Sequence, residues 1–155
     1  MFIAGTALEQ NLKNLCRSSR ERLLFISPYV KFESFEHFVS RVDSASNLDK
    51  KLITNWGLSD LIQGVSDLAV YPIARDAGWT IHIVENLHAK LYLADNKALL
   101  GSANLTSSGF SLRRRGGNIE AGCLIDVDEY LERWTEDLVY GSVAVTDRIY
   151  SDVKR

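Results

Sequence analysis

The chain has 155 residues, of which 46% are hydrophobic and 25% charged, which are ordinary values for one globular domain. Its formal net charge of -2 gives no overall basic signature for nucleic acid, although a binding surface can be local. No apolar stretch approaches the ~20 residues of a membrane span, and the first residues lack the pattern of a signal peptide. We therefore expect a single domain over residues 1–155, either a whole protein or a fragment of a longer one, in the cytoplasm and without membrane contact.

The two cysteines, Cys16 and Cys123, lie far apart in the sequence. Neither belongs to a Cys-x-x-Cys pair or to a Cys/His pattern of metal ligands. We expect both to be reduced thiols, as is typical of cytoplasmic proteins, and we expect no metal and no cofactor.

Leucines at helical spacing predict a first helix over residues 6–18. A dense apolar run over 23–30 is typical of a buried strand, and 51–56 forms a second such run. Between them, Ser34 is placed to cap a short helix.

Ser66 is placed to cap a helix that closes at Gly78, and Asp128 to cap a further helix. Four more strands are expected, at residues 79–84, 90–94, 97–101 and 118–127. Residues 141–155 predict either a last edge strand or an exit towards a further domain.

Strands that alternate with helices predict an α/β fold, a mixed β-sheet flanked by helices on both faces, with a hairpin at Asp95-Asn96. Side chains alternate along a strand, so Leu87, Ala89, Leu91 and Leu93 should share one face and belong to the core. The polar groups of the same stretch then need another explanation.

His88 and Lys90 share the other face of this stretch, roughly 6–7 Å apart. A tight turn at Asp95-Asn96 brings residues near 103 back beside His88, so Ser102 and Asn104 can converge on the same small patch. An imidazole, a fixed positive charge, a hydroxyl and an amide suit the binding of a phosphate and an attack on it.

Each of these residues also has an ordinary structural explanation when it is taken alone. Ser102 and Asn104 could satisfy a turn, and a lone histidine on a strand or helix, such as His37 or His82, is usually structural. The combination at this spacing is what favours a functional site.

The stretch HAKLYLAD reads His-x-Lys-x4-Asp, from His88 to Asp95, and Gly101-Ser-Ala-Asn follows it after five residues. This pattern resembles the signature of the phospholipase D superfamily, which usually has six residues in that spacer. The resemblance covers most of residues 50–125 and is strongest to the nuclease and restriction-endonuclease branch. There, a glutamate one strand beyond the Gly-Ser-x-Asn motif supports the catalytic histidine, and Glu120 is the residue that matches.

The resemblance implies a phospholipase D-like sandwich and a metal-independent phosphodiesterase without a cofactor. His88 would form a covalent phosphohistidine, Lys90, Ser102 and Asn104 would hold the phosphate oxygens, and Glu120 would orient an imidazole. Asp95 and Gly101 would be structural members of the motif, since Asp95 has the parity of the leucines.

The chemistry needs a second histidine as acid and base, and neither His37 nor His82 is followed by x-Lys. A homodimer with His88 of both copies in one shared site is therefore expected, as in single-motif nucleases that this chain resembles.

Nucleic acid is the expected substrate, DNA rather than RNA, with sequence specificity left to a partner or an additional domain. Arg113, Arg114 and Arg115 follow the motif and could neutralise neighbouring phosphates, or form an ordinary solvated loop. Tyr29 and Trp56, at strand ends, could stack on bases or could serve packing.

Two alternatives remain open. One is a phospholipid-hydrolysing enzyme, although no amphipathic interfacial helix or lipid anchor is visible. The other is a non-catalytic nucleic-acid-binding or dimerisation module of a larger assembly.

Overall fold

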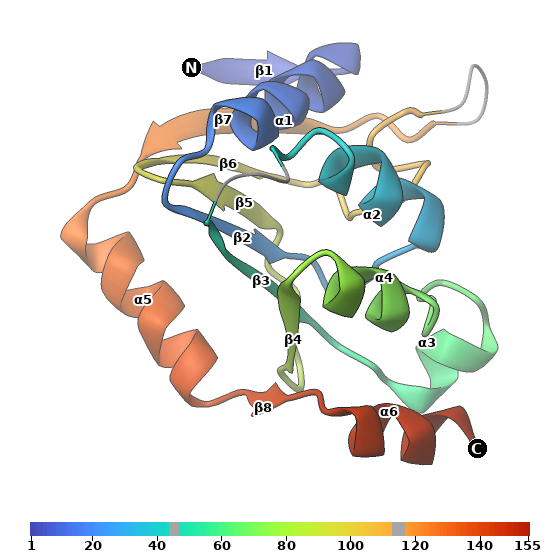
Figure 1. Ribbon diagram of the computed structural model, residues 1–155. Helices are drawn as coiled ribbons and strands as arrows, with labels where there is room; N and C mark the ends of the chain where they lie inside the picture. Colours follow the sequence, from blue (N-terminus) through green and yellow to red (C-terminus); the bar gives the residue numbers. More distant parts are fainter. Residues whose placement is uncertain (44–46, 113–116) are drawn as a thin grey trace.

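An eight-stranded sheet runs through the computed structural model, which describes residues 1–43, 47–112 and 117–155 (Figure 1). The strands are β1 (Phe2–Ala4), β2 (Arg22–Ile26), β3 (Asp49–Thr54), β4 (Trp79–Ile83), β5 (Leu91–Ala94), β6 (Lys97–Gly101), β7 (Ala121–Asp126) and β8 (Val143–Ala144). The helices are α1 (Thr6–Ser18), α2 (Phe32–Val39), α3 (Leu58–Ile62), α4 (Val70–Asp76), α5 (Glu129–Tyr140) and α6 (Asp147–Lys154).

The order of strands across the sheet is β1-β7-β6-β5-β2-β3-β4-β8. Strands β2, β3 and β4 pair in parallel, since helices connect each of them to the next. All other pairings are antiparallel. The prediction of a mixed sheet is therefore confirmed.

Helices cover both faces of the sheet, as predicted (Figure 1). On one face α1, α2 and α4 bury the larger core cluster, which includes Leu12, Phe35 and Phe38, each 0% exposed. On the other face α5 packs its Leu131 and Leu138 on a smaller cluster of strand residues. Burial on both faces explains why the central strands are continuous apolar runs.

Two of the predicted helix caps are wrong, because tertiary partners take their place. Ser34 lies inside α2, whose first N–H group, that of Phe32, donates to the carboxylate of Asp67 at 2.8 Å. The Ser66 hydroxyl accepts a hydrogen bond from Val30 N–H at 3.3 Å, and α4 begins four residues after it.

The Asp128 cap is confirmed, since its carboxylate accepts the N–H of Leu131 at 2.8 Å. Gly78 follows α4 with φ +80°, a left-handed conformation that ends helices, as predicted. Strand β1 and helix α3 were not predicted. Residues 141–155 contain the edge strand β8, paired with β4, and then helix α6.

Both cysteines are free thiols. Burial raises the pKa of the Cys16 thiol to about 12. None of the helices in the described part of the chain is both long enough and apolar enough to cross a membrane.

Candidate active site

The hairpin of β5 and β6 carries residues of the sequence motif at both of its ends, and hydrogen bonds hold its turn in place. Ala94 pairs with Lys97 across a two-residue turn at Asp95-Asn96, as predicted, and Asp95 has φ +55°. The Asp95 carboxylate accepts hydrogen bonds from the N–H groups of Arg20, Glu21 and Arg22 at 2.8–3.1 Å. Burial alone would raise the pKa of Asp95, but these N–H groups and the Arg22 guanidinium hold it below its ordinary value.

The predicted alternation along this stretch is confirmed. Leu87, Leu91 and Leu93 are buried on the α5 side of the sheet, with Ala89 packed against them. Tyr92 and Ala94 are buried on the opposite side, beneath the other helices. The strand begins one residue later than expected, at Leu91, but Gly101 N–H still donates to Lys90 O at 3.3 Å.

His88 and Lys90 therefore lie just before β5, and they contact each other. His88 is exposed, and Lys90 is half-buried. The Lys90 ammonium donates to the backbone carbonyl of His88 at 2.7 Å and lies 3.4 Å from its Nδ1. The ammonium and the imidazole thus lie side by side at the start of β5.

Ser102 and Glu120 form a second pair at the same open end of the hairpin, just after β6 and just before β7. The Ser102 hydroxyl donates a short hydrogen bond to the Glu120 carboxylate and accepts the N–H of Ala121 at 3.1 Å. Glu120 was expected to support the histidine, and in the structure its hydrogen bond goes to Ser102. Since a hydroxyl has one proton, Ser102 can donate to a substrate oxygen only if this bond is given up.

Gly101 makes the close approach of β6 and β7 possible beside Ser102. A Cβ at this position would lie 2.5 Å from the carbonyl oxygen of Ala121 and 2.8 Å from Cα of Gly122. Only glycine therefore fits at the first position of the Gly-Ser-Ala-Asn stretch without displacing β7.

Asn104 lines a cavity of about 370 Å³ together with Tyr29, and its Oδ1 is buried without a hydrogen-bond partner among the described residues. Leaving a buried acceptor unpaired costs about 1–3 kcal/mol, which calls for a functional explanation. Segment 29–31 lies beside Asn104 because Val30 bridges to Leu105 and Lys31 N–H donates to Leu105 O at 3.0 Å.

Of the other predicted binding residues, only Trp56 lies within the part of the chain that the structure describes. Trp56 packs against the larger core cluster. Arg113, Arg114 and Arg115 lie outside the described residues. Conversely, Lys31, Ser107, Ser108 and Asn118 line the cavity and were not singled out from the sequence. The polar run Thr106-Ser107-Ser108 after Asn104 was a visible signal, whereas Lys31 lies too far away in the sequence to be linked to it.

The two remaining histidines have structural partners. His37 on α2 lies 2.8 Å from the carboxylate of Glu9 on α1. His82 on β4 lies between the hydroxyls of Thr80 and Ser142, each 3.0 Å away, and burial lowers its pKa. Within the described chain neither histidine contacts His88.

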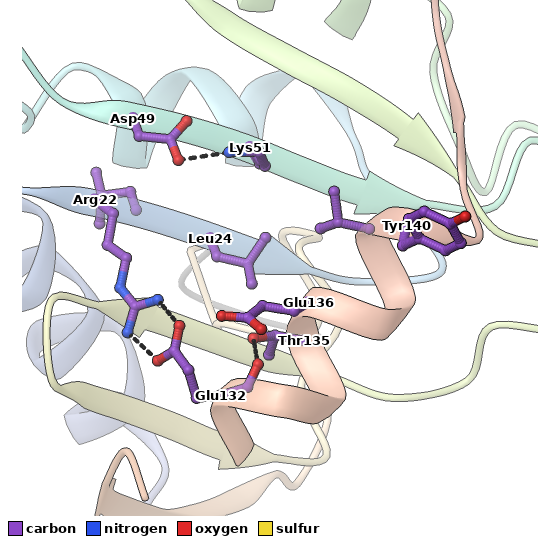
Figure 2. A pocket seen from close by; sticks show the side chains of 10 residues that line it. Arg22, Leu24, Asp49, Lys51, Glu132, Thr135, Glu136 and Tyr140 are labelled. Carbon is purple, nitrogen blue, oxygen red and sulfur yellow. Dashed lines mark hydrogen bonds and ion pairs between the residues drawn. The ribbon is translucent and has the colours of Figure 1, made fainter. Parts of the chain in front are cut away.

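Figure 2 shows a second pocket, of about 420 Å³, which holds none of the predicted site residues. It lies between α5 and the first residues of β2 and β3, at the opposite strand ends from Ser27 and Thr54. Four of its charged groups form two ion pairs, because Arg22 donates to both Glu132 oxygens at 2.5 and 2.6 Å and Lys51 donates to Asp49, and Glu136 lines the pocket beside them. The pocket is therefore a gap beside α5 in which most charged groups already have a partner.

No group of three or more His, Cys, Asp or Glu side chains that could hold a metal ion occurs within residues 1–43, 47–112 and 117–155.

Neither a protein-family model nor a curated protein sequence matches this chain. Solved structures do. NucT from Helicobacter pylori superposes with a TM-score of 0.71 at 15% identity, over 94% of this chain and 98% of its own. Nuc from Salmonella typhimurium, described as a phospholipase D family member, superposes with a TM-score of 0.72 at 13% identity. The match covers 95% of this chain and 99% of Nuc.

Two larger proteins share the fold as well. Phosphatidylserine synthase from Haemophilus influenzae gives a TM-score of 0.75 at 12% identity, over 99% of this chain and 42% of that one. TrmBL2, described as an archaeal chromatin protein with a novel mode of DNA binding, superposes with a TM-score of 0.60 at 11% identity. The match covers 94% of this chain and 52% of TrmBL2. At these identities the similarity concerns architecture, and the chain has the phospholipase D fold that its motif indicates.

Proposed function

We propose that this chain is a metal-independent phosphodiesterase, a nuclease that cleaves DNA through a phosphohistidine intermediate. The observation that carries the proposal is the placement of His88, Lys90 and Asn104. These motif residues lie on two adjacent segments of a phospholipase D fold, and the imidazole is open to solvent. The DNA-binding description of TrmBL2, which has the same fold, supports nucleic acid as substrate.

In the first step, an imidazole nitrogen of His88 attacks phosphorus and the P–O bond to the leaving strand breaks. A second imidazole, protonated, gives its proton to the leaving oxygen. That imidazole, now neutral, takes a proton from water, whose oxygen attacks phosphorus and releases His88. The Lys90 ammonium and the amide N–H groups of Asn104 donate to the non-bridging oxygens, while Ser102 and Glu120 brace the end of β6.

The second imidazole would come from another copy of the chain, because His37 and His82 are engaged elsewhere. An apolar groove beside the site supports this homodimer. The groove measures about 620 Å³ and includes Ala89, the residue between His88 and Lys90, together with Leu100 and Trp134. Leu100 is 42% exposed and Trp134 is 38% exposed, and apolar surface of this kind is typical of an interface.

The row of paired residues that contains Leu100 extends this apolar surface across the sheet. Phe2, Cys123, Leu100 and Leu91 are direct neighbours on β1, β7, β6 and β5, and Phe2 is 75% exposed. A second copy seated here would begin its contact one residue away from His88. We therefore assign the groove to the second copy.

Leu100→Glu is expected to convert the dimer to a monomer and to abolish cleavage, since a charge in an apolar interface lacks a partner. Light scattering after size-exclusion chromatography gives the mass. Tyr140→Glu is the matched control, because Tyr140 is 93% exposed outside the groove. A monomeric wild type that cleaves DNA, or a Leu100→Glu variant that stays dimeric, would contradict the assignment.

The proposed function is tested by incubating the protein with supercoiled plasmid and with single-stranded DNA, in low salt with EDTA. We expect cleavage by the wild type and by His37→Gln, and none by His88→Ala. Cleavage that requires magnesium or survives His88→Ala would refute the proposal.

A phospholipid substrate is the second candidate, because phosphatidylserine synthase shares the fold. Release of a free head group or of phosphatidic acid from vesicles, with intact plasmid, would favour it. Binding of DNA without turnover, unchanged in His88→Ala, would instead indicate a binding module.

A further inference from the structure

The cavity that Asn104 shares with Tyr29 has a use beyond the cleavage step. It measures about 370 Å³, within the range of pockets that hold small ligands. Besides Tyr29 and Asn104, the side chains that matter here are Lys31, Ser107, Ser108 and Asn118. They come from three segments of the chain and bring an aromatic ring, two hydroxyls, two amides and an ammonium group to the lining of one space.

The walls of this cavity are fixed before any ligand binds. The Ser27 hydroxyl accepts the N–H of Leu105 at 2.9 Å and donates to the carbonyl of Tyr29 at 2.7 Å. Asn118 N–H donates to Ser108 O at 2.9 Å, which holds the third segment in place. A preformed pocket loses little conformational entropy when a ligand enters.

Gly109 closes the loop that carries the two hydroxyls. A Cβ at this position would lie 2.2 Å from the carbonyl oxygen of Asn104, so only glycine allows this loop to fold back on Asn104. The loop is therefore shaped around the residue that the proposed mechanism places on the phosphate.

The charges in the cavity favour an uncharged polar ligand. Lys31 is already held by the carboxylate of Asp67 at 2.9 Å and by the carbonyl of Gly64 at 2.5 Å. The remaining side chains of the lining, as far as the structure describes it, are uncharged, and the polar ones are hydroxyls and amides beside the ring of Tyr29. A quaternary ammonium head group usually binds in a cage of several aromatic rings, and Tyr29 is the one aromatic residue among the described residues that line this cavity. A nucleobase has a flat face for stacking and polar edges for hydrogen bonds.

We propose that this cavity binds one unpaired nucleoside next to the scissile phosphate, and that the chain therefore acts on single-stranded nucleic acid. The inference rests on the proposed function, because Asn104 connects the cavity to the phosphate. A base in a duplex stays stacked and keeps its Watson–Crick edge occupied, so it cannot enter such a pocket unless it is flipped out.

The test measures binding separately from cleavage, with His88→Ala protein, which leaves the probe intact. The probes are a short oligothymidylate, the same strand annealed to its complement, and a strand with abasic residues in place of the thymidines. We expect the single strand to bind at least tenfold more tightly than either of the other two. Adding Tyr29→Ala should weaken single-strand binding about tenfold and leave duplex binding unchanged.

Tyr29→Phe keeps the ring and should restore single-strand binding, which separates stacking from a folding defect. Tyr140→Ala, in the same His88→Ala background, is the matched control and should bind like its parent. Equal binding of all three probes, or equal effects of Tyr29→Ala and Tyr140→Ala, would overturn the inference.

The two proposals can fail separately. Selective binding that depends on Tyr29, without EDTA-resistant cleavage by the wild type, would support nucleoside binding in the cavity and refute the proposed nuclease activity. Cleavage of single strands and duplexes at equal rates, unaffected by Tyr29→Ala, would support the proposed nuclease activity and refute nucleoside binding in the cavity.

Discussion

The two ends of the β5–β6 hairpin differ in how their polar groups are satisfied. At the turn, the Asp95 carboxylate accepts three backbone N–H groups, and Arg22 donates to both the Asp95 carbonyl and Glu132. At the open end, His88 is exposed and Asn104 Oδ1 is buried without a partner among the described residues. Members of one sequence motif thus lie in two different environments.

This difference separates the residues that hold the fold from those that are available for chemistry. A fully paired group stabilises the native state, whereas a group without a partner has its hydrogen-bonding capacity left for a substrate. Substitutions at the turn should therefore change stability, and substitutions at the open end should change activity.

The largest expected effect is that of His88→Ala on cleavage. Loss of the nucleophile should reduce the rate by at least about a thousandfold, while the melting temperature stays close to that of the wild type because the side chain is exposed. Plasmid nicking and thermal unfolding measure the two quantities. A large fall in melting temperature would show that the His88 side chain stabilises the fold, as the residues at the turn do.

Ser102→Ala and Glu120→Gln should each reduce kcat by up to about 10², because their hydrogen bond braces the strand end next to Asn104 and its loss would misplace that side chain. If Glu120 instead acts on His88, its substitution should alter the pH–rate profile, whereas Ser102→Ala should not. Superimposable profiles for the two variants would support the pairing seen in the structure. The wild-type pH–rate profile should be bell-shaped, because one imidazole must be neutral to attack phosphorus and the other must be protonated to act as the acid.

Asp95→Ala should destabilise the fold by about 2–4 kcal/mol, because three backbone N–H groups lose their acceptor. Residual activity below the melting temperature should remain. The pKa of Asp95 is lowered in the folded state, so its contribution is present above the ordinary value near 4 and is lost as the pH falls through the folded pKa. Urea unfolding at about pH 7 and about pH 3 should therefore show that the difference in unfolding free energy between wild type and Asp95→Ala is smaller at the lower pH.

The smallest effect is expected at Glu132→Gln, about 0.5–1 kcal/mol, since its ion pair with Arg22 is about one third exposed and screened by salt. The Arg22 guanidinium lowers the pKa of Glu132, so this contribution too should disappear in acid. Unfolding in low and high salt measures it. An effect as large as that of Asp95→Ala would show that the ion pair stabilises this end of the hairpin as much as the hydrogen bonds of the turn do.

The sequence predicted the central sheet well because each buried strand is a dense apolar run. It also predicted the alternation around Leu91 and the turn at Asp95-Asn96, which depend on residues close together in the chain. Strand β1 was missed because three residues carry little pattern and gain their order from pairing with β7, more than a hundred residues away.

The misplaced caps have a similar origin. Ser34 and Ser66 have the local chemistry of helix caps, but the fold brings the Asp67 carboxylate to the first N–H of α2, that of Phe32, and brings Val30 N–H to the Ser66 hydroxyl. In the site, the partner of Glu120 and the cavity around Asn104 depend on packing between distant segments. Motif residues were therefore predictable, whereas their hydrogen-bond partners were not.

The most direct test of the central claim is to trap the covalent intermediate. Wild-type protein is mixed with DNA labelled at internal phosphates, quenched rapidly in alkaline detergent, and digested for peptide mapping. We predict label on the peptide that contains His88, absent in His88→Ala. Cleavage without label on the protein, or label on another residue, would contradict the claim that His88 is the nucleophile.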